Sequence, residues 1–489
     1  MIEGQVGNVF HREPLVKHLE SCMGKTLGEL DVNHAFRKTI GNPKVTGIAG
    51  DVVEQSVLFL KPNPEQRPDI VVNGNHYEVK TTGLRDSKKN RGTLEAKEPM
   101  SITAVSPNAI VNEEYRNSSF WHKVEHMLLF YYKYDSSTTV IAAEYARFPM
   151  LTYQFHEYSD FSEEDQRTLA NDWTRVRNFI RYLQSHYDDC EAEYGRISHD
   201  LRKTLLLLDT APKWPANPRF RFKRTFVTSI YRAHIAKRQL EKLPEEYSDY
   251  KDLDDKCYSI KKQYQGKTVG ELCDRFGIKV CKKLKSITEP IIIKMFGGTA
   301  KEMRKVEFFN KVGIWGKSFV LSKSGTKTED AKFFTIRFDE FKDDNILFET
   351  SQFYDFFSSA KVLVAVFEEP SAMAPLVKNK FVGFKTVIFD DKFIYEEVKP
   401  VWERVRSLVR DRTLRDIPRI GANGKQIRNK NGVLSSAPNF PKSSEGVVFV
   451  RGTGTDSSNK PEVVNGVRMY YQQVWIRGDY MAELVRDAF

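Results

Sequence analysis

The sequence predicts a mixed α/β protein (α+β within each unit) built from two tandem domains of similar fold. Three observations support this prediction. Helical and strand-like patterns are mixed along the chain, a short sequence near the start recurs about half a chain later, and 489 residues suffice for several domains. Hydrophobic residues make up 40% of the chain and charged residues 29%, which is the composition of a globular protein. A disordered or fibrous chain is therefore excluded.

The expected elements follow from residue periodicity. Apolar side chains recur every three or four positions over residues 50–60 and 163–183, which predicts helices. Residues 332–338 and 446–450 are rich in β-branched and aromatic residues, which predicts strands. The same mixture is expected in both halves of the chain.

The repeated sequence sets the domain organisation. Residues 24–30 read Gly-Lys-Thr-Leu-Gly-Glu-Leu, and residues 266–272 differ only by Val in place of Leu. The match indicates either a duplicated domain or two similar helix starts, each with a Thr/Glu capping box. The spacing favours duplication. We expect a first domain at residues 1–240, a charged linker at 241–259 and a second domain at 260–489.

Charge and cysteine content narrow the class of protein. The formal net charge is +11, which modestly favours an acidic partner such as nucleic acid. Five cysteines without a C-x-x-C pair predict reduced thiols and no structural zinc. No apolar run is long enough to cross a membrane, and the start lacks a secretory signal pattern. We therefore expect a cytoplasmic protein.

Residues 68–80 carry the most informative chemistry. Asn73-Gly74 between two β-rich runs predicts a type I′ hairpin. Glu78 and Lys80 then share one face of the returning strand, and Asp69 on the first arm lies beside them. Two carboxylates and the carbonyl of Val79 are hard oxygen ligands suited to Mg²⁺, next to an amine that can hold water. The alternative is a solvated surface hairpin with a Glu/Lys pair.

A third carboxylate precedes the hairpin. Residues 47–60 show an apolar helical face, and Glu54 adjoins that face. A carboxylate there is unfavourable unless it has a cation or a hydrogen-bond donor. Glu54 is therefore a candidate to support the metal.

The order of these motifs resembles a known family. Gly-x-x-Gly-x-x-x-Glu at residues 47–54, Pro68-Asp69 and Glu78-x-Lys80 are similar to the mismatch-repair nicking endonuclease MutH and related restriction endonucleases. Residues 26–30 resemble its opening helix, residues 162–173 its acidic helix, and residues 121–124 its central strand with a functional lysine, here Lys123. The resemblance covers most of residues 20–235 and implies Mg²⁺-dependent cleavage of DNA.

The DNA contacts that the resemblance implies lie in basic segments. Residues 219–229 resemble the family's basic strand and helix, within a stretch of eight Lys/Arg and no acidic residue at 210–240. The expected contacts in the first domain are Lys123, Arg219, Arg221, Lys223 and Arg224. A second basic stretch, residues 401–432, contains nine Lys/Arg and three acidic residues. Its arginines are equally suited to guanine edges and to phosphates.

The second half resembles the extra copy found in a two-domain, GATC-cutting subgroup of these enzymes (type IIE), where it is an allosteric DNA-binding domain. Residues 439–445, 448–451 and 474–476 carry this resemblance and place Lys442 and Arg451 as DNA contacts. With Lys317 aligned to Lys80, Trp315 replaces Glu78. An indole cannot bind Mg²⁺, so this copy is expected to be catalytically silent.

The sequence thus predicts a Mg²⁺-dependent type II restriction endonuclease that cuts double-stranded DNA with its first domain and binds a second site with the other. Binding at two sites would allow a dimer or a DNA-looped complex. Two alternatives are a repair nickase of the MutH kind and a non-catalytic DNA reader that recognises sequence or methylation.

Overall fold

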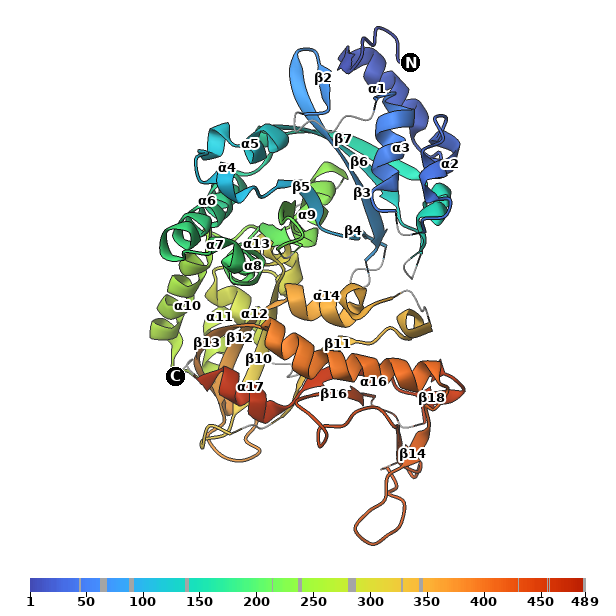
Figure 1. Cartoon of the computed structure of the whole chain (residues 1–489). Coiled ribbons are helices and arrows are strands. Elements are labelled where there is room, and N and C mark those ends of the chain that lie inside the picture. Colours follow the sequence, from blue (N-terminus) through green and yellow to red (C-terminus); the bar gives the residue numbers. More distant parts are fainter. Residues whose placement is uncertain are drawn as a thin grey trace.

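The computed structural model describes residues 1–486 except 44, 62–67, 88–91, 137–139, 213, 236–239, 280–286, 327–328, 343–345, 430, 455 and 457. Figure 1 shows an elongated molecule in which the first half (residues 1–240) and the second half (residues 241–489) form two successive lobes. Helices and several sheets are mixed in both, as the sequence predicts. No helix in the described residues is long and apolar enough to cross a membrane.

A mixed sheet organises the first half. Its strands run in the order β1-β2-β3-β6-β7, and β4 pairs with β3. A smaller sheet has the order β5-β9-β8. The strands are β1 Val9–Phe10, β2 Ile70–Val72, β3 Asn75–Asp86, β4 Leu94–Ala96, β5 Met100–Ala104, β6 His126–Lys133, β7 Met150–Glu157, β8 Leu208–Ala211 and β9 Arg219–Phe222. The helices are α1 Arg12–Cys22, α2 Leu27–Leu30, α3 Ile48–Val52, α4 Pro107–Ile110, α5 Ser119–Val124, α6 Glu163–His186, α7 Cys190–Glu193, α8 Gly195–His199 and α9 Arg224–Ile235.

The second half contains two three-stranded sheets, β10-β12-β13 and β11-β19-β16, and two ribbons, β14-β15 and β17-β18. The strands are β10 Ile314–Leu321, β11 Ala331–Thr335, β12 Lys361–Glu368, β13 Lys380–Ile388, β14 Asp416–Pro418, β15 Ser436–Pro438, β16 Val448–Gly452, β17 Glu462–Val464, β18 Val467–Met469 and β19 Gln472–Ile476. The helices are α10 Tyr250–Tyr264, α11 Val269–Phe276, α12 Thr288–Met295, α13 Glu307–Val312, α14 Gln352–Ser359, α15 Asp391–Phe393, α16 Lys399–Arg410 and α17 Gly478–Leu484.

The two repeated sequences adopt the same local structure. Thr26 and Thr268 each cap a helix through a complete capping box. The residue two before each cap is a glycine with φ +81. Its N–H donates to a carbonyl at the start of a distant strand, that of Met150 in one half and Phe381 in the other, at 2.8 Å in both. Each copy is thus a capped helix that docks on the equivalent strand of its own half. The structure therefore agrees with both interpretations of the repeat, a duplicated domain and two similar helix starts.

The central strands also correspond. In each half a parallel pair is followed by an antiparallel pair, β3-β6-β7 and β10-β12-β13. Each antiparallel pair has a register shift, directly after Tyr131 in β6 and directly after Val366 in β12. Before each of these strands a fully buried serine, Ser118 or Ser351, caps a short helix. These shared irregularities are what a duplicated unit would preserve.

The segment expected as a charged linker is helical in its second part. Within residues 241–259, α10 begins at Tyr250. Its buried residues are spaced by three or four positions along the helix: Tyr250, Leu253, Cys257, Ile260 and Tyr264. This stripe is hidden in the sequence because charged residues separate its members. The helix packs against β13 of the second half.

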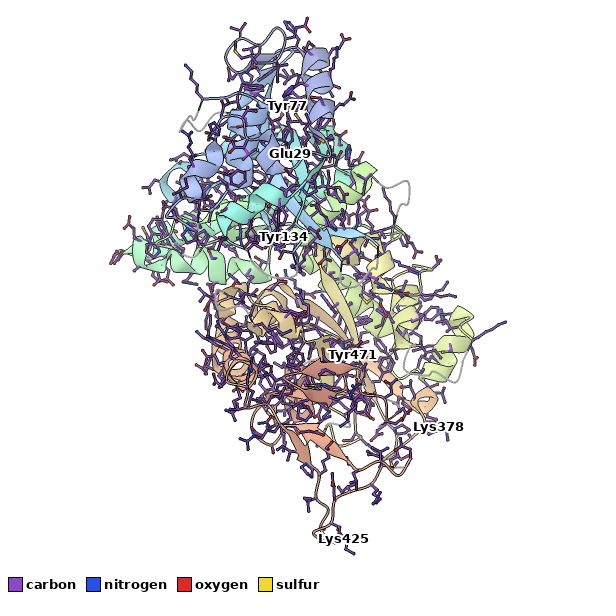
Figure 2. The ribbon with its side chains drawn as sticks, turned by 90° about the vertical axis from the view of Figure 1, so that its right-hand side faces the viewer. Glu29, Tyr77, Tyr134, Lys378, Lys425 and Tyr471 are labelled. Atoms are coloured by element: carbon purple, nitrogen blue, oxygen red, sulfur yellow. The ribbon has the colours of Figure 1, made fainter. Side chains whose placement is uncertain are left out.

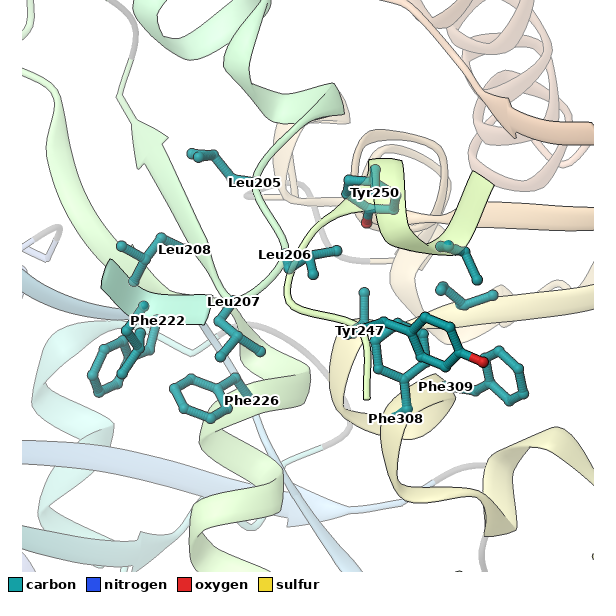
Figure 3. Packing of buried hydrophobic residues seen from close by; sticks show 14 of the residues in the cluster. Leu205, Leu206, Leu207, Leu208, Phe222, Phe226, Tyr247, Tyr250, Phe308 and Phe309 are labelled. Atoms are coloured by element: carbon teal, nitrogen blue, oxygen red, sulfur yellow. The ribbon is translucent and has the colours of Figure 1, made fainter. Parts of the chain in front are cut away.

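The two halves also share a hydrophobic core. One buried cluster includes Leu205–Leu208, Phe222 and Phe226 from the first half with Tyr247, Tyr250, Phe308 and Phe309 from the second. Figure 3 shows these side chains meeting across the junction. This cluster continues through both halves, whereas two other buried clusters of the described residues lie within the first half and within the second half.

Charged side chains cross the same junction. Lys311 of α13 lies 2.6 Å from Asp165 and 3.4 Å from Glu164, both at the start of α6, and its side chain is only 4% exposed. Lys361 of β12 donates to the carbonyl of Leu205 at 3.0 Å. An unpaired charge buried at this junction would be strongly unfavourable, so these contacts require one particular geometry. They fix how one half sits on the other.

Candidate active site

The hairpin predicted from Asn73-Gly74 is present. Asn73 has φ 49 and Gly74 φ 89, the pair of positive values that a type I′ turn requires. Ile70 pairs with Tyr77 across β2 and β3, so Asp69, one residue earlier, lies opposite Glu78. The turn chemistry therefore sets the register that brings these two carboxylates together.

Glu78 is held between two lysines. Its side chain is 3% exposed, Lys80 lies 2.5 Å from one carboxylate oxygen, and Lys123 lies 2.6 Å from the other. Burial raises the pKa of Glu78 and so does the charge of Asp69, whereas both lysines act to lower it. A buried carboxylate with two cations is an ion cluster, and clusters of this kind gather at functional sites.

Asp69 is oriented by the main chain. One of its carboxylate oxygens accepts a hydrogen bond from the N–H of Val79 at 2.8 Å. Val79 lies between Glu78 and Lys80 on β3, so the bond ties Asp69 to the strand that carries them. No hydrogen bond from the described residues is given to the other oxygen of Asp69.

Glu54 approaches the cluster from a helix. The predicted helix begins at Ile48 as α3 and continues as a π turn over Val53–Val57, which contains Glu54. Burial, together with the negative charges of Asp69, Asp51 and Glu78, raises the pKa of Glu54 to about 7, although Lys80 acts against this. Ionised carboxylates that lie close together repel one another, and a cation bound among them would relieve this repulsion.

The donor set fits a hard divalent cation. Carboxylates of Asp69, Glu78 and Glu54 and a main-chain carbonyl are the oxygen ligands that Mg²⁺ prefers, and it commonly keeps several waters. Within the described residues no three acidic, His or Cys side chains converge as a ready-made metal site. Both oxygens of Glu78 are engaged by lysines in this structure. The fit is therefore one of donor chemistry, and Glu78 would have to leave a lysine in order to bind a cation.

Lys123 is placed differently from its expectation. Residues 121–124 were expected in a central strand, but they form the end of α5, directly before β6. Lys123 was expected to contact DNA, and its observed partner is Glu78, with its side chain 10% exposed. Sequence spacing could not reveal this contact, because it joins two elements that meet only in the folded sheet.

The basic strand and helix at residues 219–229 are present as β9 and α9. Arg219 is exposed. Arg221 lies 2.6 Å from Asp209, Lys223 donates to the carbonyl of Leu206 at 3.1 Å, and Arg224 lies 2.6 Å from Asp355 in the second half. These three side chains are bound to protein groups in this structure, and their contacts with DNA stay a prediction.

The two DNA contacts predicted in the second half, Lys442 and Arg451, lie in different surroundings. Lys442 is exposed. Arg451 lies 2.9 Å from Asp330 and its guanidinium packs over the ring of Trp475. Lys442 is therefore open to solvent, and the Arg451 side chain is 39% exposed despite these two contacts.

The strand register of the second half bears on the expectation that this half does not cleave DNA. Glu78 pairs with Met127, four residues before the irregularity in β6, and Trp315 pairs with Val362, four residues before the one in β12. Trp315 thus stands at the position of Glu78, as the sequence alignment had it. Two residues on, Lys317 donates to the carbonyl of Lys332, and burial lowers its pKa to about 8.

The space beside Trp315 is filled. A Cβ added to Gly316 would lie 2.0 Å from the sulfur of Met303, so that side chain packs directly on β10. The ring of Trp315 meets that of Phe356 edge-on at 5.1 Å. Sulfur and aromatic groups thus surround the position that corresponds to Val79.

Comparisons with known proteins agree with this geometry. Residues 58–172 match the family model of the DNA mismatch repair enzyme MutH, a range that contains Asp69, Glu78, Lys80 and Lys123. The chain is also 22% identical to the Type II restriction enzyme Sau3AI of Staphylococcus aureus, with 96% of this chain and 97% of that protein covered. These similarities support a relationship to the MutH-like type II restriction endonucleases. The range that matches MutH is the part of the first half that forms the hairpin, β6 and the start of α6.

Proposed function

We propose that this chain is a Mg²⁺-dependent type II restriction endonuclease that hydrolyses phosphodiester bonds of double-stranded DNA at a short sequence, GATC. The observation that supports it best is the group formed by Asp69, Glu78, Lys80 and Lys123 inside the MutH-like range. The choice of GATC comes from resemblance to the two-domain subgroup.

Each residue of the site has a proposed task. Asp69, Glu78 and the carbonyl of Val79 hold Mg²⁺, and Glu54 supports it or a second ion. A bound Mg²⁺ lowers the pKa of its water and offsets charge on the phosphate. Lys80 orients the attacking water and stabilises negative charge that grows on the phosphate oxygens. Water then displaces the 3′ oxygen, so the products carry 5′-phosphates.

Lys123 also belongs to this catalytic group. Its ammonium lies 2.6 Å from Glu78, so it holds that carboxylate ionised and in position when no metal is bound. The same ammonium is close enough to the cluster to neutralise a phosphate once Glu78 turns to the cation.

The second half is proposed to bind another copy of the recognition sequence without cutting it. Trp315 at the position of Glu78 supports the absence of cleavage, and the shared core at the junction gives a physical route for coupling. We assign catalysis to residues 1–240 and effector binding to 260–489, with α10 running from the linker into the second unit.

Cleavage assays test the proposal. Wild type with Mg²⁺ is expected to linearise a plasmid that contains GATC, and sequencing of the ends should give that site and 5′-phosphates. Glu78→Ala is expected to leave the plasmid intact. Nicking without linearisation would indicate a repair nickase, and no cleavage by wild type would indicate a DNA reader.

A plasmid pair tests the effector part. If effector DNA changes the catalytic state, a plasmid with two sites is cut faster than one with a single site. Equal rates on the two plasmids would remove the effector proposal while leaving the nuclease intact.

A further inference from the structure

An arm projects from the second half, far from the catalytic hairpin. It rises from the ribbon of β14 and β15 and consists of residues 419–435. Figure 1 shows this arm and the β2 hairpin at opposite ends of the molecule, and Figure 2 shows Lys425 at the tip. We call residues 419–435 the arm.

The arm is ordered by its own backbone. Arg419 donates its N–H to Ser435 at 2.9 Å, Ser435 donates to Ile427 at 2.7 Å, and Ile427 donates to Arg419 at 2.8 Å. Three segments are thus joined pairwise in a closed ring at its base. Two tight turns extend from the ring, with Gly424 donating to Gly421 and Gly432 to Asn429.

The arm contributes nothing to the hydrophobic cores. None of its described residues belongs to a core cluster, although Leu414 and Phe440 on either side of it do. A side-chain hydrogen bond from Asn431 to Asp456 at 3.0 Å joins it to the rest of the chain. An ordered element that does not stabilise the core is a candidate for binding.

The surface of the arm is both basic and apolar. Its sequence contains four Lys/Arg and no Asp or Glu. Arg419, Lys425 and Arg428 are exposed, and none takes part in an ion pair between described residues. Ile420 is 57% exposed and Ile427 is 45% exposed, so aliphatic surface lies beside the cations.

This combination fits a DNA duplex. Cations that form no ion pair with the described residues complement a row of phosphates, and their binding releases counterions. Exposed aliphatic side chains contact thymine methyl groups or wedge at base steps. A narrow β-ribbon is also of a size that enters the major groove. The sequence left the basic stretch at 401–432 equally suited to phosphates and base edges, and the arm presents groups for both.

We propose that the arm enters a groove of the second duplex, with Arg419 and Lys425 on phosphates and Ile420 against the bases. This inference rests on the proposed function, since it names the element with which the second half binds its effector DNA. It also explains why the arm is pre-ordered, because a rigid element loses little conformational entropy on binding.

Stoichiometry of binding tests the inference. The full-length Glu78→Gln variant keeps DNA uncut and serves as parent, and the probe is a short duplex with one GATC site. Native mass spectrometry is expected to show two duplexes per parent chain. Adding Arg419→Ala with Lys425→Ala is expected to weaken the second duplex on the order of tenfold and to reduce the slope of log affinity against log salt by about two.

Two further variants make the test specific. Lys378→Ala with Lys380→Ala removes the same charge from exposed positions outside the arm and is expected to leave two duplexes bound. Ile420→Ser is expected to weaken the second duplex with an unchanged salt slope, because an apolar contact releases no counterions. The arm has no core of its own, so circular dichroism should show all variants folded.

The possible failures can be told apart. A parent that binds one duplex contradicts both the effector proposal and the inference. If the parent and the arm variants all bind two duplexes with equal affinity, the inference alone is overturned. That result would indicate a protein partner for the arm. Loss of both duplexes in the arm variants would overturn it as well, because the arm is assigned to the second duplex only.

Discussion

Replacing Glu54 by glutamine is expected to stabilise the protein at alkaline pH when no divalent cation is present. Burial and three neighbouring carboxylates raise the pKa of Glu54 from 4.5 to about 7. A group with a raised pKa in the folded state binds its proton more tightly there than in the unfolded chain. Its favourable contribution is therefore complete below about pH 4.5 and is lost as pH rises to about 7.

The magnitude follows from that difference. One pKa unit corresponds to about 1.4 kcal/mol, so a rise from 4.5 to about 7 corresponds to roughly 3 kcal/mol. Glu54 is partly exposed, so solvent screening reduces the expected penalty to about 2 kcal/mol. Glutamine does not titrate and avoids this penalty. The Glu54→Gln variant should thus be about 2 kcal/mol more stable at pH 8 and nearly equal to wild type at pH 5.

Thermal unfolding in EDTA at both pH values measures the effect. Added Mg²⁺ at pH 8 is expected to reverse the order, because the cation neutralises the clustered carboxylates and binds wild type better. Glu163→Gln, at a side chain that is 89% exposed, is the matched control and should show no pH-dependent gain. The reasoning is refuted if Glu54→Gln gives the same melting difference at pH 5 and pH 8.

Three other substitutions test the site and the junction. Lys123→Met removes a cation that lowers the pKa of Glu78, so the carboxylate is harder to ionise. Cleavage with Mg²⁺ should fall on the order of 100-fold, and the pH profile of cleavage should move upward. An unchanged pH profile would exclude this role for Lys123. Asp172 is 1% exposed and accepts hydrogen bonds from the N–H groups of Leu206–Leu208. Asp172→Ala should therefore lower the free energy of unfolding, measured by chemical denaturation, by about 3 to 5 kcal/mol. A decrease below about 1 kcal/mol would contradict that account. Lys311→Met removes the ammonium that Glu164 and Asp165 share at the junction and should cost a similar ~3 to 5 kcal/mol, with accelerated proteolysis between the halves. Wild-type resistance to protease would argue against this account.

The sequence by itself determined the features that arise from short-range physics. Asn73-Gly74 specified a turn with two positive φ values, and this turn alone places Asp69 opposite Glu78. Each repeated Thr and Glu closes a capping box within four residues. Such structures depend on hydrogen bonds and periodicities that neighbouring residues supply. Their motifs can therefore be recognised in the sequence before the fold is known.

Only the tertiary structure decided which charges meet. Lys123 reaches Glu78 across 45 residues of chain, and Lys361 reaches Leu205 across 156. Lys223 and Arg224 look like a DNA-binding row in the sequence, yet the folded chain directs them to Leu206 and Asp355. Composition cannot separate a cation that faces phosphate from one that balances a buried carboxylate, because both are basic residues near aromatic ones. The choice depends on burial, which is set by how distant strands and helices pack together.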